Sequence, residues 1–329
     1  MRAWHFSENA YPYLPPAETY PSIRVTLPNK HYDPAKGAEL YDRYIDEWLI
    51  AEDVGLDIML NEHHQTATCV DPAAPLMLAI LARASTKARL LILGNPISNR
   101  RQPVRIAEEM AMVDVISKGR LEAGFVRGVP YEILPANSNP VRMNERHWEA
   151  LDLIVKAWTT HDGPFSWEGR FFHQRAVNIW PRPYQQPHPP IWIPSQGSNE
   201  TIEWAAHPDR KYLYMQNFNP YAAAVKYLNY YREVAIERYD YEASSSQLGW
   251  AGPCYVAETD EQAMDEAREG LEFLFNKILR MPPGMFFPPG YTSIPSMRPP
   301  RRRLPSKPPT SLPRKFSISI RRSSRVCAR

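Results

Sequence analysis

The feature that most constrains the fold of this chain is a repeated alternation of short apolar runs with amphipathic segments. We expect seven of the runs to be strands, at residues 4–7, 56–60, 90–93, 121–126, 191–193, 212–215 and 248–256. Strands that alternate with helices usually pair in parallel. The run at 90–93 is entirely apolar, as a strand buried on both faces requires. The sequence therefore predicts a parallel α/β fold.

Seven strand-helix units approach the eight of a (β/α)8 TIM barrel, which a chain of 329 residues is long enough to form. The helices that follow the strands are expected at 39–54, 72–84, from 103, 145–158, from 199, 220–238 and 260–279. No eighth strand is recognisable. At 161–190 the alternation stops, and aromatic residues, Gly and Pro predict an insert with a hairpin turn at 167–171. We expect an incomplete barrel domain over residues 1–297.

The segment 298–329 differs in composition from the rest of the chain. It holds eleven of the 39 basic residues, six prolines and no acid, so residues 1–297 carry 28 basic and 36 acidic residues, a net charge of −8. Such a segment cannot bury enough apolar surface to order itself. We predict a disordered tail that is foreign to the fold, as a frame-shifted extension would be. The alternative, a basic arm for nucleic acid or acidic lipid, is not favoured, and we predict neither partner.

Composition also bears on the compartment. No run approaches the roughly 20 apolar residues that cross a bilayer, and the N-terminus lacks the apolar centre of a signal peptide. A cytoplasmic protein is predicted. The three cysteines, Cys69, Cys254 and Cys327, are spaced for neither a disulfide framework nor a zinc site, so reduced structural thiols are expected.

Residues 61–64, with the sequence Asn-Glu-His-His, directly follow the second predicted strand, at the end where barrel enzymes build their active sites. Adjacent histidines on an extended segment point in opposite directions and do not readily bind one metal ion, so no metal site is predicted. A neutral imidazole can exchange a proton near neutral pH. His63 is the candidate proton-transfer residue, with Glu62 as the residue that would orient it. In the alternative, one histidine packs under the barrel rim, the other forms a local hydrogen bond, and Glu62 faces solvent.

Further motifs occur in order at the ends of later strands: Gly94-Asn95-Pro96, Ser117-Lys118-Gly119-Arg120-Leu121, Gly124-Phe125-Val126-Arg127-Gly128, and residues 196–206 from Gln196 to Ala206. Gly197-Ser198 opens a predicted helix, whose first amides lack partners within the helix and attract anions. A plain helix N-cap is the alternative. No Gly-x-Gly-x-x-Gly follows a strand and no phosphate loop occurs, so neither a Rossmann site nor a phosphate-loop nucleotide site is predicted.

Together with residues 61–67, from Asn61 to Ala67, these motifs resemble the luciferase-like flavin-dependent monooxygenases over about residues 1–297. The resemblance implies an enzyme that uses reduced flavin mononucleotide (FMN) and dioxygen to oxygenate a small organic substrate through a flavin peroxide. It also implies a separate flavin reductase and pairing of barrels as homodimers through outer helices. Two alternatives stay open: a deazaflavin-dependent oxidoreductase on the same barrel, and a non-catalytic flavin-binding remnant.

The resemblance also assigns roles to residues. It places His63 near the reactive edge of the flavin and Asn95 at the polar edge of the ring. It assigns the FMN phosphate to Gly197, Ser198 and Arg127, which can form a bidentate contact, and Thr201 would add a hydroxyl. The aromatic residues of the insert either cover the flavin or simply pack on the barrel; they are Trp167, Phe171, Phe172, Trp180 and Tyr184.

Overall fold

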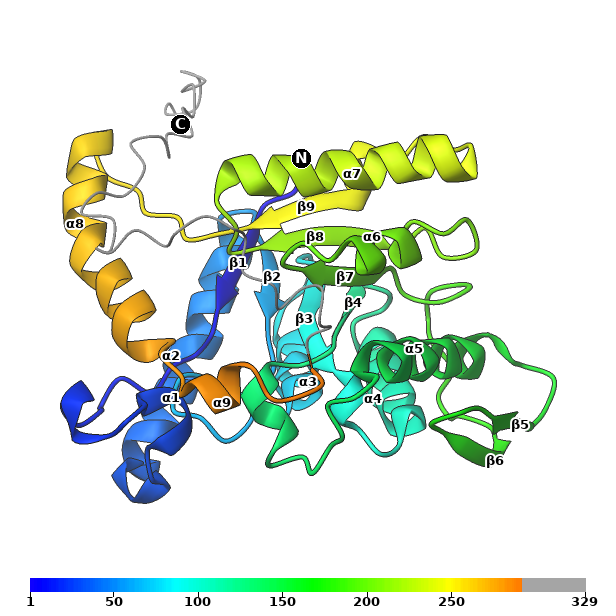
Figure 1. The fold of residues 1–329 in the computed structure, drawn as a ribbon, viewed down its shortest axis with the longest axis horizontal. Coiled ribbons are helices and arrows are strands. Elements are labelled where there is room, and N and C mark those ends of the chain that lie inside the picture. The colour runs from blue at the N-terminus through cyan, green and yellow to red at the C-terminus, as the bar shows by residue number, and fades with distance from the viewer. Residues whose placement is uncertain (292–329) are drawn as a thin grey trace.

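The computed structural model describes residues 1–291, so the predicted disordered segment 298–329 lies outside the described residues. A seven-stranded parallel sheet, with strand order β1-β2-β3-β4-β7-β8-β9, curls into a half-barrel (Figure 1). The strands are β1 (Trp4–Ser7), β2 (Asp57–Leu60), β3 (Leu90–Pro96), β4 (Leu121–Val126), β7 (Ile191–Ser195), β8 (Leu213–Asn217) and β9 (Leu248–Ala251). The prediction of an incomplete parallel barrel with seven strands is confirmed.

Helices follow the strands as predicted, with shifted ends. They are α2 (Pro34–Asp53), α3 (Ala74–Ala84), α4 (Pro103–Ile116), α5 (Met143–Thr159), α6 (Asn199–Ala205), α7 (Tyr221–Tyr239) and α8 (Asp260–Phe273). Helix α2 begins at Pro34 rather than at residue 39, because the Asp33 carboxylate accepts a hydrogen bond from Ala35 N at 2.9 Å and caps the helix there. Strand β9 ends at Ala251 rather than at residue 256, since Pro253 has no amide hydrogen to donate to a ladder.

The sheet separates two apolar clusters. Ile58 and Leu60 of β2 face the larger cluster between sheet and helices, whereas Met59 faces the inside of the curl. This alternation is the period of two that side chains follow along a strand. The inner cluster contains Met59, Leu91, Leu93, Trp192 and Met215. Apolar residues therefore fill the sheet on both faces, and the polar chemistry is confined to the ends of the strands.

The predicted insert is an antiparallel hairpin of β5 (Phe165–Glu168) and β6 (His173–Val177), which lies beyond α5 (Figure 1). Glu149 of α5 accepts hydrogen bonds from the amides of Phe171 and Phe172 and from Trp167 Nε1. Phe172 is buried, but Trp180 is 82% exposed. These contacts support the second alternative for the insert, in which its aromatic residues pack on the barrel.

The half-barrel has two open edges within residues 1–291. In this part of the chain β1 pairs only with β2, and β9 pairs only with β8. Helix α8 follows β9, yet none of its residues is buried. Two short helices complete the described chain, α1 (Ile23–Thr26) and α9 (Pro283–Phe286). The site is therefore best defined around β2, β3, β4 and β7, in the middle of the sheet.

Candidate functional site

The strand order brings the predicted site residues to one edge of the sheet. Strands β2, β3, β4 and β7 are successive neighbours and run parallel, so their carboxyl ends lie side by side. His63 follows β2, Asn95 lies near the end of β3, Arg127 follows β4 and Gly197 follows β7. The sequence prediction that these residues share one end of a barrel agrees with this topology.

His63 is held between two acidic side chains and is 13% exposed. Its Nδ1 lies 3.3 Å from Oε1 of Glu132, and its Nε2 lies 3.9 Å from Oε1 of Glu8. Glu132 belongs to the 3-10 helix η4 (Pro130–Ile133), directly after β4. Its carboxylate also accepts hydrogen bonds from His64 N and Val129 N, both at 3.0 Å. One buried carboxylate thus fixes both the ring of His63 and the backbone after it.

The electrostatics of Glu132 favour its charged form. Burial raises the pKa of this carboxyl group, but the hydrogen bond and charge of His63 and the amides of His64 and Val129 lower it more, so the pKa falls below its usual value. A carboxylate only accepts hydrogen bonds, so Nδ1 of His63 must be the donor in this pair. Nε2 is then the nitrogen that can accept a proton from a ligand.

The burial and contacts of Glu62 differ from those predicted. It neither faces solvent nor orients His63, because its side chain is fully buried and contacts His64 instead. The four groups around its carboxylate are His64 Nε2 at 3.1 Å, Ala74 N at 3.0 Å, Asn95 Nδ2 at 3.4 Å and the guanidinium of Arg100. Glu62 therefore ties the ends of β2 and β3 to the start of α3. The orienting role expected of Glu62 falls to Glu132.

Asn95 is completely buried on β3. Its Nδ2 donates to Glu62, whereas its Oδ1 has no hydrogen-bond partner. Buried side-chain oxygens are nearly always bonded, so an unsatisfied one marks a place where a ligand donor can bind. The isoalloxazine ring of a flavin carries such an N–H on its polar edge, and the role that the resemblance implies for Asn95 stays a prediction.

Arg127 is linked to the start of α6 through α5. Its Nη1 donates to Asn144 Oδ1 at 2.9 Å, and Asn144 Nδ2 donates to Glu200 Oε2 at 3.2 Å, in the first turn of α6. Arg127 Nη1 also lies 3.3 Å from the carbonyl oxygen of Tyr291, and the Tyr291 ring packs against the guanidinium with 3.7 Å between Arg127 Cζ and the ring centre. Arg127 and the α6 region are thus close enough to share a ligand.

The sequence predicted free amides at Gly197 and Ser198, but in the structure both amides have a hydrogen-bond acceptor. Both donate to Oγ of Ser195, at 3.0 and 3.2 Å, and Ser198 Oγ caps α6 by accepting from Thr201 N at 3.3 Å. Gly197 has φ +114°, and a Cβ there would lie 2.3 Å from the Tyr227 ring, so only glycine fits. The N-cap alternative describes this segment. Ser195 went unnoticed in the sequence, although its position just before Gly197 was a usable signal.

Metal-binding clusters and membrane-spanning helices can be assessed for residues 1–291. Within residues 1–291, no group of three or more His, Cys, Asp or Glu side chains is arranged as a metal ion would need. None of the helices in this range combines the length and apolar character that crossing a membrane takes.

The fold is a parallel α/β half-barrel with buried polar groups at the carboxyl ends of its strands, and comparisons with known proteins specify the family. Residues 24–283 match the luciferase-like monooxygenases, so the chain belongs to this family. Two relatives are the oxygenase component of flavin-dependent trigonelline monooxygenase from Acinetobacter baylyi, 32% identical over 165 residues, and the alkanal monooxygenase beta chain from Photorhabdus luminescens, 28% identical over 150 residues. The matches cover 49% and 45% of this chain and 45% of each relative, less than half the length of either.

Solved structures share the fold at lower identity. Monooxygenase RslO1 from Streptomyces bottropensis superimposes with a TM-score of 0.68 and 22% identity, over 84% of this chain and 78% of the other. The oxygenating constituent of 3,6-diketocamphane monooxygenase from Pseudomonas putida, solved with FMN, gives 0.65 and 19%, over 83% and 73%. An F420-dependent secondary alcohol dehydrogenase gives 0.61 and 17%, over 87% and 76%.

Proposed function

We propose that this chain is the oxygenase component of a two-component flavin monooxygenase. In this proposal the chain works in the cytoplasm, a separate reductase supplies reduced FMN, and one atom of dioxygen is added to a small organic substrate. The observation that carries the proposal is His63, held through Nδ1 by buried Glu132 at the sheet edge that also bears Asn95 and Arg127. The name of the Acinetobacter relative, an oxygenase component, and the FMN in one structural neighbour support it.

The residues at this edge fit FMN. When bound, FMN supplies the activation of dioxygen. Asn95 Oδ1, which lacks a partner, would accept from the polar edge of the ring. Arg127 would bind the phosphate, since within residues 1–291 only Nη1 of its guanidinium nitrogens makes a hydrogen bond. The hydroxyls of Ser198 and Thr201 would complete the phosphate site, with Gly197 allowing the close approach.

His63 would move the proton in this reaction. With Nδ1 donating to Glu132, Nε2 can accept a proton from the substrate or from the reacting cofactor and return it later. Glu132 stabilises the ring while it is charged, in the way that a buried carboxylate orients a catalytic histidine. His63 is the proposed catalytic residue, and Glu132 is a positioning residue.

The function is tested with the purified full chain, a flavin reductase and candidate substrates. We expect binding of reduced FMN and substrate-dependent incorporation of isotope-labelled oxygen. His63→Ala should lower turnover by about 10²- to 10⁴-fold while FMN affinity stays within about twofold. His173→Ala, on the exposed hairpin, is the matched control and should behave as wild type. A chain that neither binds reduced FMN nor consumes oxygen in its presence would refute the proposal.

The phosphate site has its own test. Arg127→Ala should weaken FMN by about tenfold or more, as loss of a charge-assisted pair does, and should leave riboflavin almost unaffected because riboflavin has no phosphate. Equal losses for the two flavins would reject this assignment.

Two alternatives stay distinguishable. The fold match to an F420-dependent dehydrogenase favours a deazaflavin cofactor, and comparing the affinities of FMN and F420 decides between them. The open edges of the sheet favour a non-catalytic remnant, which would bind FMN without incorporating oxygen.

We also propose that two copies pair through α3 and α4. Five large apolar side chains are exposed on these helices: Leu76, Ile80, Met112, Val115 and Ile116. A cavity of about 580 Å³ lies between the helices, and Glu62 and Arg100 are among the residues that line it. Exposed apolar groups gathered on neighbouring helices mark a docking face. Sedimentation should show a dimer that Met112→Lys dissociates, whereas Ile236→Lys, on α7, should not.

A further inference from the structure

Arg24 is a buried arginine without a counter-ion. It is 4% exposed, and neither its Nε nor its Nη1 has a hydrogen-bond partner among residues 1–291. Within residues 1–291, its guanidinium forms no ion pair with a carboxylate. Arginine keeps its proton at any physiological pH. The chain therefore buries a positive charge that it does not neutralise, an arrangement that is unfavourable until an anion binds.

The remainder of the chain offers no acidic side chain to this arginine. Glu272 is the last acidic residue, so residues 292–329 contain neither Asp nor Glu. Other arginines in residues 1–291 are more exposed than Arg24, and two of them show how a guanidinium is usually satisfied. Arg89 pairs with Glu122 at 2.9 Å, and Arg120 donates to the carbonyl oxygens of Ala82 and Ala88. Within residues 1–291, Arg24 is the one arginine that is buried, and a negative charge to neutralise it must come from outside the chain's acidic side chains.

The position of Arg24 connects it with the proposed site. Its Cζ lies 5.5 Å from the ring centre of Tyr131, which is also buried and whose Oη has no hydrogen-bond partner. Tyr131 immediately precedes Glu132, the residue that contacts His63. Two unsatisfied donors, one of them charged, therefore lie one residue away from the group that positions the proposed proton-transfer residue.

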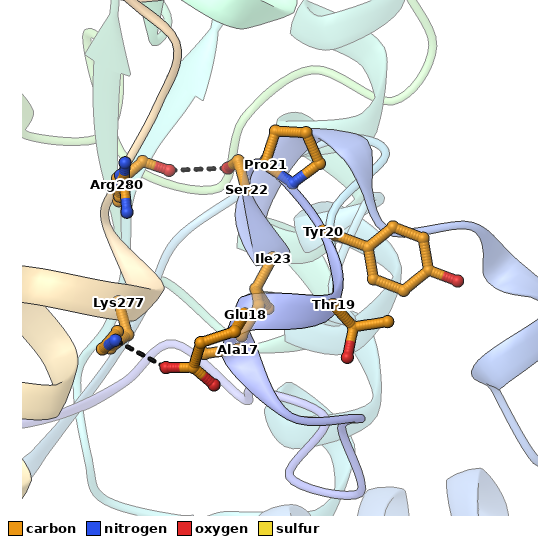
Figure 2. A pocket seen from close by; sticks show the side chains of 9 residues that line it. All are labelled: Ala17, Glu18, Thr19, Tyr20, Pro21, Ser22, Ile23, Lys277 and Arg280. Carbon is orange, nitrogen blue, oxygen red and sulfur yellow. Dashed lines mark hydrogen bonds and ion pairs between the residues drawn. The ribbon is translucent and has the colours of Figure 1, made fainter.

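There is open space beside the segment that carries Arg24. Residues 17–23 line one side of a cavity of about 430 Å³, and Lys277 and Arg280 line the other (Figure 2). The walls are joined by an ion pair between Glu18 and Lys277 at 2.7 Å and by a hydrogen bond from Ser22 Oγ to the Arg280 carbonyl oxygen at 2.6 Å (Figure 2). A small organic molecule has room next to Ile23, the residue before Arg24, although Arg24 and Tyr131 do not themselves line this cavity.

We propose that Arg24 and Tyr131 bind a carboxylate group of the substrate, so that the proposed monooxygenase acts on small organic acids. The planar guanidinium can donate two parallel N–H bonds to the two carboxylate oxygens, and Tyr131 Oη can donate a third. One unpaired positive charge matches one negative charge, which favours a carboxylate over a phosphate dianion. This inference rests on the proposed function and names its substrate class.

The first experiment measures the stability of the ligand-free full chain. Arg24→Met removes an unpaired buried charge while keeping much of the packing, so it should leave the melting temperature unchanged or raise it. The matched control is Arg120→Met at the opposite end of the sheet. That substitution deprives several carbonyl oxygens of their donor and should lower the melting temperature.

The second experiment measures binding of two probes to the FMN-loaded chain by calorimetry. Benzoate carries the carboxylate, and benzamide is its neutral analogue of the same shape. Wild type should bind benzoate more tightly than benzamide. Arg24→Met should weaken benzoate by about tenfold or more and leave benzamide within about twofold. Tyr131→Phe should weaken benzoate by less. FMN affinity should be unchanged in both variants, because its phosphate is assigned to Arg127.

The outcomes separate the possible roles of Arg24. Lost FMN affinity in Arg24→Met, with riboflavin unaffected, would show that the anion is the cofactor phosphate and would overturn the proposal. A melting temperature lowered as much as in Arg120→Met would show a structural arginine, and equal binding of benzoate by wild type and Arg24→Met would also overturn it. Failure of the whole proposed function would instead appear as an absence of reduced-FMN binding in wild type.

Discussion

Two clusters of buried polar groups at opposite ends of the half-barrel are satisfied to different extents. At the amino end, buried carboxylates are saturated: Glu122 accepts from Arg2 at 2.6 Å, Arg89 at 2.9 Å and Trp192 Nε1 at 2.5 Å. Asp114, at the foot of the same region, accepts two hydrogen bonds from Gln185, both at 2.8 Å. These groups have no unsatisfied buried atom among the described residues.

At the carboxyl end several unsatisfied atoms lie near the candidate site, although within residues 1–291 His5 Nε2 and Arg210 Nε show that such atoms also occur elsewhere. Asn95 Oδ1, Tyr131 Oη, Asp71 Oδ1 and two nitrogens of Arg24 are all buried without a hydrogen-bond partner. A saturated network stabilises a fold, whereas an unsatisfied buried group costs free energy and persists where binding needs it. We infer that the network around Glu122 mainly stabilises the fold, whereas the unsatisfied groups at the carboxyl end mainly serve binding.

The largest expected effect is at the amino end. Glu122→Ala leaves Arg89 and Trp192 without their shared acceptor, and breaking such a buried pair costs about 3–5 kcal/mol of folding free energy. Urea unfolding measures this loss. The fraction that stays folded should bind FMN as wild type does. A variant with normal stability and weakened FMN would show that the two ends are not separate.

A smaller effect, on activity, is expected at the carboxyl end. Glu132→Gln keeps the shape but removes the charge that stabilises His63, so kcat should fall by about 10- to 100-fold, or roughly 1.4–2.7 kcal/mol. Steady-state kinetics should show the loss in kcat, with the Kd for FMN within about twofold of wild type. Glu132→Asp should recover part of it. Equal losses in both variants, together with a lowered melting temperature, would mark Glu132 as structural only.

Asp71 makes the stability of the carboxyl end depend on pH. Burial raises its pKa to about 6, although a hydrogen bond from Asn9 Nδ2 at 2.5 Å lowers it in part. Between pH 4 and 6 the folded chain therefore holds a proton that the unfolded chain has lost, so the stability contributed by Asp71 falls as the pH rises through this window and stays low above it.

Replacing Asp71 should remove this penalty. Asp71→Asn should stabilise the fold by about 1–2 kcal/mol at pH 8 and by little at pH 4. Thermal unfolding at the two pH values measures the difference. Asp209→Asn, an exposed residue, is the control and should show no such dependence. A destabilised Asp71→Asn at pH 8 would mean that the ionised carboxylate is needed and that the carboxyl end is not strained there.

The strands and their order could be predicted from the sequence, but side-chain contacts between residues far apart in the sequence could not. Periodicity located all seven strands, and strand order then placed His63, Asn95 and Arg127 on one edge. The carboxylate that holds His63 was missed because Glu132 reaches it from the far side of β3, across 69 residues of sequence. Tyr291 packs on Arg127 across 164 residues. Pairings of this kind depend on how loops fold back over strand ends, which no local pattern encodes.

The smallest expected effect concerns Glu200, which carries a negative charge beside the proposed phosphate site. Its carboxylate accepts from Asn144, which in turn accepts from Arg127. If the FMN phosphate binds there, Glu200→Gln removes a like charge but keeps an oxygen for Asn144. FMN affinity should then rise by about two- to threefold at low salt, and the gain should shrink at high salt because the pair is exposed. The affinity for riboflavin should not change. An equal gain for both flavins would show that the phosphate does not bind near α6. A loss for FMN alone would mean that Glu200 chiefly holds Asn144 and Arg127 in position.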